Sequence, residues 1–180
     1  MTTPITAETI HQDVLQRLPG TDVTVEAGAL IVKPADLVKL CRFLKESEPY
    51  RLDYLSNLCG VDYLGDQARV ETVYQLYSME KKHGPVILRL RTENRADKTH
   101  LPSLTPVWRG CEFQEREIYD LYGIILDGHP DLRRILMWDG FKDHPMRKDF
   151  VGPDDYEYEP TAHEEVLERT KQHLAKETKA

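Results

Sequence analysis

The spacing of apolar residues predicts two helices and a hairpin near the start of the chain. Apolar side chains recur at helical spacing over residues 7–18, and a Pro-Gly pair ends that run. Two short β-rich pieces, residues 23–25 and 30–32, are joined by four residues that include a glycine, which predicts a hairpin. Pro34 then begins a second helix, because proline is tolerated in a first turn, where its missing N–H is not needed.

Period-two alternation predicts the sheet. Residues 69–78 and 85–91 alternate apolar and polar side chains and are expected to pair as an antiparallel hairpin. Residues 50–63 mix apolar and acidic positions, and we expect a strand that runs into an irregular turn at Gly60. No alternating βαβ series occurs, so the pattern predicts an α+β fold, mainly an antiparallel sheet with helices on one face.

The chain changes character after residue 126. A short helix is expected over residues 111–122, with Gly123 as the residue that ends it. Residues 127–160 then contain four prolines and little periodicity, which is typical of a functional loop or of a segment ordered by a partner. We therefore divide the chain into an α+β core, residues 1–126, and an extended partner-binding segment with a terminal helix, residues 127–180. We expect this segment to bury itself on sister polypeptides instead of its own core.

Composition and charge exclude several classes of protein. With 40% hydrophobic and 31% charged residues, the chain has the composition of an ordinary globular protein. Its 24 Lys and Arg against 31 Asp and Glu give a net charge of −7, which opposes binding to nucleic acid or to an anionic lipid surface. No apolar stretch approaches the ~20 residues needed to cross a bilayer, and no signal peptide is evident. We expect any link to a membrane to run through partners.

Cysteine and histidine spacing gives no metal or disulfide signal. Cys41, Cys59 and Cys111 are odd in number and far apart, so we expect three buried, reduced thiols. His129 and His144 stand fifteen residues apart without a third ligand at metal spacing. A histidine before a proline is more often a hydrogen-bonded loop residue, and no metal is predicted.

One pair of carboxylates invites a catalytic interpretation. Glu117 and Asp120 fall three residues apart and share a face of the expected helix, as acid–base catalysis would require. Arg116 lies four residues from both Glu112 and Asp120, so we expect intrahelical ion pairs at the surface instead. A stand-alone hydrolase is a minor alternative, because no nucleophile elbow, phosphate-binding loop or dinucleotide fingerprint occurs.

Two charged features suggest contact with other proteins. A turn signal at Gly128 precedes Asp131, which could cap a short helical turn and aim Arg133 and Arg134 the same way. Such a pair suits gripping a carboxylate or backbone carbonyls across an interface, with phosphate as an alternative. Residues 154–165 hold six acidic residues and two tyrosines, which fits a solvated tail and a docking strip equally well.

Three ordered motifs resemble a known family over about residues 51–158. They are Glu115-Arg116-Glu117-Ile118-Tyr119-Asp120-Leu121-Tyr122-Gly123-Ile124, then Gly128-His129-Pro130-Asp131-Leu132-Arg133-Arg134-Ile135-Leu136, then His144-Pro145-Met146-Arg147-Lys148-Asp149-Phe150. Together they are similar to the signature of the C subunit of the proton-pumping NADH:quinone oxidoreductase, respiratory complex I, the 30-kDa-subunit family. Met146 replaces a commoner leucine and Cys111 a usual alanine, and both changes keep the small or apolar character.

The resemblance implies a subunit that is not catalytic by itself, in the peripheral arm on the cytoplasmic face of a bacterial membrane, packed against subunits D, B and I. It implies no cofactor bound by this chain, since FMN, iron–sulfur clusters and quinone belong to the rest of the complex. Equivalent subunits of membrane-bound hydrogenases and of ferredoxin- or deazaflavin-dependent dehydrogenases fit the same motifs. The motif residues that we expect at interfaces are Glu115, Arg116, Glu117, Asp120, Gly123, Gly128, His129, Pro130, Asp131, Arg133, Arg134, Arg147, Lys148 and Asp149.

Overall fold

The computed structural model describes residues 5–65, 68–95 and 99–152. The acidic strip and the terminal helix predicted within residues 153–180 lie outside this part. Residues up to Phe150 belong to one compact unit. Its elements in chain order are α1 (Ala7–Arg17), β1 (Val23–Glu26), β2 (Ala29–Val32), the 3-10 turn η1 (Pro34–Asp36), α2 (Leu37–Glu46), β3 (Tyr54–Tyr63), β4 (Arg69–Ser78), β5 (His83–Arg91), β6 (Thr99–Pro102), η2 (Arg109–Cys111), α3 (Glu112–Tyr122) and β7 (Ile124–Asp127).

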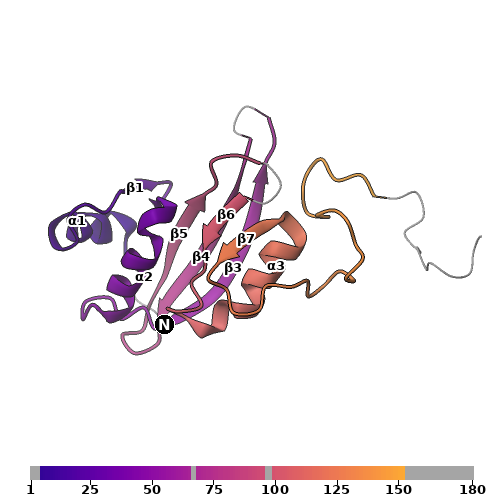
Figure 1. Ribbon diagram of the computed structural model, residues 1–180. Helices are drawn as coiled ribbons and strands as arrows, with labels where there is room; N and C mark the ends of the chain where they lie inside the picture. Colours follow the sequence, from indigo (N-terminus) through magenta and orange to yellow (C-terminus); the bar gives the residue numbers. More distant parts are fainter. Residues whose placement is uncertain (1–4, 66–67, 96–98, 153–180) are drawn as a thin grey trace, which may run out of the picture. The chain divides into compact units, whose positions relative to one another are not determined.

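The main sheet has five strands in the order β1-β2-β5-β4-β3 (Figure 1). Its pairs are antiparallel except for β2 and β5, which run parallel. The predicted α+β class is therefore confirmed, as are both hairpins. A second sheet pairs β6 and β7 in parallel, with α3 between them in the chain. The alternation did not predict β6 as a strand, because four residues ending in a proline are too few to show a period.

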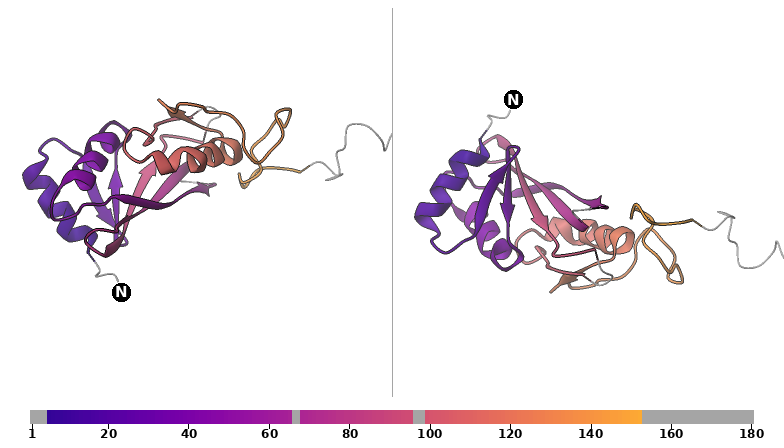
Figure 2. Two further views of the ribbon diagram at one scale, coloured as in Figure 1. Left: turned by 90° about the horizontal axis from the view of Figure 1, so that it is seen from below. Right: turned by 90° about the horizontal axis from the view of Figure 1, so that it is seen from above.

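One face of the main sheet carries the core. Along β4, the side chains of Val70, Thr72, Tyr74 and Leu76 are all buried, as their alternation predicts. α2 and α3 lie on the same side of the sheet, together with the small β6–β7 sheet (Figure 2). The helices contribute buried apolar residues that include Ile10, Val14, Leu37, Leu40, Leu44 and Ile118. The alternate side chains of β4 and β5 face away from this core.

Gly60 lies within β3, and the turn predicted there is wrong. The strand continues through this residue, which pairs with Thr72 of β4. The ring of Tyr122, at the end of α3, packs against the glycine so closely that an added Cβ would lie 2.5 Å from the ring atom Cε2. A glycine inside a strand often marks such a close approach instead of a bend.

Replacing Gly60 with alanine should therefore lower the free energy of unfolding by about 1–3 kcal/mol, the usual cost of overpacking. Gly110 supplies the matched control, because nothing lies within 4 Å of its added Cβ. Urea denaturation of the two alanine variants measures the difference. Equal free energies of unfolding for both variants would show that the Tyr122 ring does not select glycine at position 60.

Candidate functional site

The candidate site is the irregular path that follows β7, residues 128–150, which we call the anchored segment (orange beside α3 in Figure 1). It contains no helix or strand, so its backbone N–H and C=O groups need partners from elsewhere. Side chains and backbone groups of α3, together with an ion-pair cluster at the end of β3, supply many of them. These contacts fix the path of the segment.

The first anchor is the carboxylate of Asp120 on α3, which is fully buried. Its Oδ2 accepts hydrogen bonds from three consecutive backbone N–H groups, those of Ile135 (3.1 Å), Leu136 (2.8 Å) and Met137 (2.8 Å). Its Oδ1 accepts from Nη1 of Arg134 at 2.6 Å. Burial by itself would raise the pKa of Asp120, but these donors outweigh it and hold the pKa below its usual value. Asp120 is therefore a charged anchor.

This arrangement corrects the predicted surface ion pairs. Asp120 is buried, whereas Glu117 is exposed, so the two carboxylates do not form an acid–base pair. Arg116 does not close an ion pair along the helix. Its Nε and Nη2 donate to the backbone C=O groups of Arg133 (3.1 Å) and Arg134 (2.9 Å). The irregular segment competes for these charged side chains, because its buried backbone groups have no helical or strand partner.

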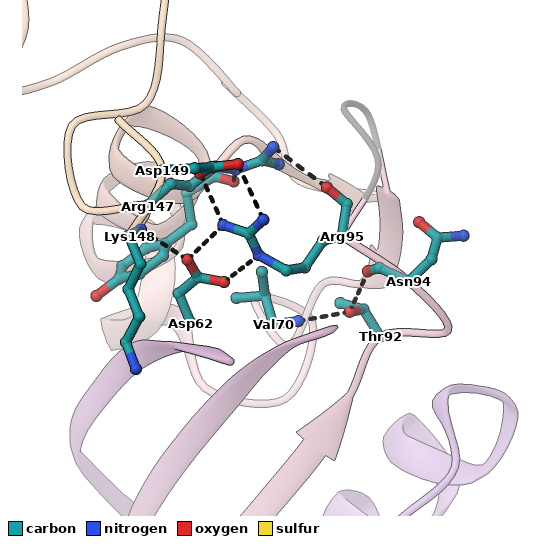
Figure 3. A network of polar contacts seen from close by, with 9 residues as sticks. Asp62, Val70, Thr92, Asn94, Arg95, Arg147, Lys148 and Asp149 are labelled. Atoms are coloured by element: carbon teal, nitrogen blue, oxygen red, sulfur yellow. Dashed lines mark hydrogen bonds and ion pairs between the residues drawn. The ribbon is translucent and has the colours of Figure 1, made fainter. Parts of the chain in front are cut away.

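The second anchor is an ion-pair cluster around Arg95 (Figure 3). The Arg95 guanidinium binds both oxygens of Asp62, at 2.6 Å each, and both oxygens of Asp149, at 3.0 and 2.7 Å. The backbone N–H of Lys148 donates to Asp62 at 2.8 Å. Burial would raise the pKa of Asp62, but Arg95 outweighs it and holds that pKa low, and Arg95 also lowers the pKa of Asp149. The cluster joins β3, the loop after β5 and the end of the anchored segment.

The last turn of α3 contributes a third set of contacts. A helix leaves its final C=O groups without helical partners, and the anchored segment supplies donors for three of them. These pairs are Arg147 Nε with the C=O of Tyr122 (2.8 Å), the Met146 N–H with the C=O of Leu121 (3.2 Å), and His144 Nδ1 with the C=O of Asp120 (3.0 Å).

Gly123 permits this close packing. It ends α3 as predicted, with φ +76°, a conformation that favours glycine. A Cβ at this position would also overlap the imidazole of His144. Both the backbone conformation and the contact with the anchored segment therefore require glycine here.

Glu115 is a buried carboxyl that braces α3 from inside. Its Oε2 accepts from the Ser103 hydroxyl and its Oε1 from the Leu104 N–H, each at 2.6 Å. Burial raises the pKa of Glu115, and the hydrogen bonds oppose that rise only in part. The sequence placed Glu115 at an interface, whereas the structure places it between α3 and the loop after β6.

The pH dependence of stability should report on Glu115. A carboxyl whose pKa is higher in the folded state binds more protons when folded, so its contribution to stability falls as the pH rises above about 4.3, the ordinary glutamate value. Glu115→Gln cannot ionise, so the variant should gain stability relative to the wild type as the pH is raised toward 8. Urea denaturation across this range measures the difference. A difference between Glu115→Gln and the wild type that stays flat across this pH range would contradict burial as the cause.

The two adjacent arginines of the second motif take different environments. Arg134 is bound to Asp120, whereas the Arg133 side chain is 68% exposed and its Nε pairs with Asp131 at 2.9 Å. The expectation that both guanidiniums point the same way is therefore wrong. Asp131 begins no helical turn. Its N–H donates to Nδ1 of His129, whose Nε2 donates to the C=O of Glu112 at 2.9 Å.

The other predicted motif residues lie at the surface of the segment. Gly128 adopts φ +85° directly after β7, and Pro130 is exposed. The side chain of Lys148 is exposed, although its N–H is bound to Asp62. Asp62 and Arg95 were missed by the sequence motifs. Asp62 stands opposite the core residue Val70 of β4, and this register becomes visible only in the structure.

The three thiols differ in their burial, which the sequence did not predict. Cys41 and Cys111 are buried, and burial raises the pKa of both. Cys59 on β3 is only half-buried, which corrects the expectation of three buried thiols. Within the described residues, no group of three His, Cys, Asp or Glu side chains is arranged to hold a metal.

Apolar side chains stand exposed along the anchored segment. The exposed fractions are 38% for Ile135, 59% for Leu136, 53% for Trp138 and 54% for Met146. Trp138 packs edge-to-face on Phe141, with 4.8 Å between the ring centroids. The backbone of Ile135 and Leu136 is thus fixed inward on Asp120 while apolar side chains of the segment remain exposed to solvent. Exposed apolar side chains of this kind become buried when a segment binds another protein.

Comparison with known proteins gives the family. The sequence model of a protein family, described as the 30 Kd subunit of respiratory-chain NADH dehydrogenase, matches residues 30–156. The chain belongs to this family. The NADH-quinone oxidoreductase C 2 subunit of Rhizobium meliloti (strain 1021) is 48% identical over 123 residues, 68% of this chain and 65% of the relative. The corresponding C subunit of Caulobacter vibrioides is 40% identical over 146 residues, 79% of this chain and 72% of the relative.

The fold of the 30-kDa subunit family extends to a distant respiratory complex. A chain in the structure of the archaeal membrane-bound sulfane sulfur reductase aligns with a TM-score of 0.61 at 22% identity, over 80% of this chain and 85% of that one. The match to the Rhizobium meliloti relative spans just under two thirds of that relative's length.

The region matched by the 30-kDa subunit family includes α3, the anchored segment and both anchors. The resemblance seen in the three motifs is therefore confirmed. Within these motifs, Asp120, Arg134 and Asp149 form contacts inside the chain. In the described residues, no helix is long and apolar enough to span a membrane.

Proposed function

We propose that this chain is a non-catalytic peripheral-arm subunit of a proton-translocating NADH:quinone oxidoreductase, on the cytoplasmic face of a bacterial membrane. It scaffolds the neighbouring subunits D, B and I, which carry iron–sulfur clusters or form the quinone site. The chain itself binds no flavin, cluster or quinone. Membership of the 30-kDa subunit family and the names of the relatives support this assignment.

The observation that carries the scaffolding role is that apolar side chains of the anchored segment are exposed while its backbone is held by hydrogen bonds. Leu136 has its N–H bound to buried Asp120 but its side chain 59% exposed. An interface element that is already ordered loses less conformational entropy on binding. Exposed Arg133, with its planar fork of donors, adds a polar contact at the rim of this surface.

The geometry gives a hydrolase no support. The Asp120 carboxylate already accepts four hydrogen bonds from its own chain, so it is not available as a general base. Glu117 is exposed, whereas Asp120 is buried, so the two carboxylates lie in different environments. The equivalent subunit of a related complex is the stronger alternative, because the archaeal sulfane sulfur reductase chain shares the fold. Measuring whether the purified complex oxidises NADH or ferredoxin distinguishes these two kinds of complex.

The test places a charge among the exposed apolar side chains of the anchored segment. Leu136→Asp should reduce incorporation of the chain into the membrane complex by about tenfold or more, as expected for an interface hot spot. Native gels of membranes measure the assembled fraction, and urea denaturation verifies that the free variant folds. Leu15→Asp is the matched control, because Leu15 is 56% exposed on α1. Equal incorporation of both variants would remove the interface role of the anchored segment.

A further inference from the structure

A second charged feature lies on the face of the main sheet that points away from the core. Along β4, Val70 and Thr72 face the core, so Arg69 and Glu71 lie on the opposite face. The partners of Glu71 come from this strand and from β5, which contributes Arg89 and Arg91. We call these three arginines with Glu71 the arginine face.

The guanidiniums of the arginine face are held in fixed orientations. Arg69 and Arg91 each place Nε 2.9 Å from Oε1 of Glu71, and Arg89 contacts Oε2 of the same carboxylate. Arg89 Nη2 also donates to the Tyr63 hydroxyl at 2.7 Å. The carboxylate beneath them is fully buried. Three cations from two neighbouring strands are thus ordered before any partner binds.

The arginine face retains positive charge and free donors. Besides Glu71, one further carboxylate, Glu26, pairs with Arg91 at 2.7 Å, so three cations meet two anions. The side chains of Arg69, Arg89 and Arg91 are 21%, 18% and 28% exposed. Within the described part of the chain, none of their Nη1 groups donates a hydrogen bond. This positive surface stands out in a chain whose net charge is −7.

We propose that the arginine face docks an acidic segment of a neighbouring subunit, whose Asp or Glu side chains accept hydrogen bonds from the unused Nη1 groups. Half-buried Val73 and Ile87 flank the arginines on the same sheet face and add apolar contact. Arginine forks suit such carboxylates because their donors are planar and already oriented. The inference rests on the proposed function only in placing the chain within a complex, and it adds a surface distinct from the anchored segment.

Val73 allows a test that leaves the arginines in place. It pairs directly with Arg89 across β4 and β5, so Val73→Glu puts a carboxylate of this chain beside the guanidinium, where it competes with the partner's acidic residues. Val73→Gln matches its size without the charge. When membranes are washed with 0.5 M NaCl, about tenfold more of the Val73→Glu chain than of the Val73→Gln chain should dissociate from the complex. Urea denaturation of the free variants should show Val73→Glu to be no less stable than Val73→Gln.

Crosslinking identifies what covers the face. A benzoylphenylalanine at Gln75, the next residue along β4 on this face, should crosslink in the assembled complex to a partner peptide that contains Asp or Glu. Equal retention of both Val73 variants, or crosslinks confined to this chain, would overturn the proposal. If Leu136→Asp still blocks assembly while both Val73 variants assemble normally, the docking inference alone fails. If Leu136→Asp assembles normally and the Val73 variants differ, the anchored segment's role fails instead.

Discussion

Asp120→Ala is expected to lower the free energy of unfolding by about 3–5 kcal/mol, the cost of breaking a buried, hydrogen-bonded ion pair. The substitution removes at once the acceptor of three backbone N–H groups and the partner of Arg134, whose side chain is only 14% exposed. Urea denaturation followed by circular dichroism measures the loss. Hydrogen exchange should also show faster exchange at the amides of Ile135, Leu136 and Met137.

Asp131→Ala is the matched control. Asp131 also pairs with a nearby arginine, but its side chain is 50% exposed, and such surface pairs contribute little to stability. The two aspartates therefore separate the effect of burial from that of an ion pair as such. Similar small losses for both variants would show that the anchored segment does not depend on Asp120.

Arg95→Met should cost a comparable amount, about 3 kcal/mol at neutral pH. The change leaves the Asp62 carboxylate, 2% exposed, with the Lys148 N–H as its remaining donor within the cluster, and frees Asp149 from the anchor. Because Arg95 holds the pKa of Asp62 below its usual value, the stability that it adds is present above about pH 3.9 and is lost as the pH falls further. The deficit of the variant should therefore shrink in acid.

A double-mutant cycle tests this explanation for Arg95. Asp62→Asn removes the buried charge, so Arg95→Met should cost less in that background than in the wild type. Chemical denaturation of the four proteins at pH 7 gives the coupling free energy. Strict additivity of the two substitutions would contradict a direct ion pair between Arg95 and Asp62.

Local periodicity was enough to predict most of the secondary structure. The alternation of β4 and β5 and the helical stripe of α1 depend on which side chains meet the core, so the pattern is visible in the sequence. β6 was missed because it is short. The role of Gly60 was misread because the feature that requires a glycine there is the Tyr122 ring, sixty-two residues away in the chain. Contacts at such separations leave no periodic trace.

The same limit explains the errors at the candidate site. Helical spacing predicted partners for Arg116 and Asp120 within the helix, but their real partners are backbone groups of residues 133–137 and, for Asp120, also the Arg134 guanidinium. The sequence predicted an irregular stretch over residues 127–160, and the part of it that the structure describes after β7, residues 128–152, contains no helix or strand. The sequence also led us to expect burial of this stretch on other polypeptides. Instead, residues 128–150 are anchored to their own chain and expose apolar side chains. The division after residue 126 stays a prediction.

The central claim is that the anchored segment is ordered by its own chain and offers its apolar side chains to a partner. Hydroxyl-radical footprinting of the free chain and of the assembled complex tests it directly. Met146 and Trp138 should be oxidised in the free chain and protected in the complex, whereas Met79, 65% exposed after β4, serves as the reference that stays reactive. Equal oxidation of Met146 and Trp138 in both states would contradict the claim.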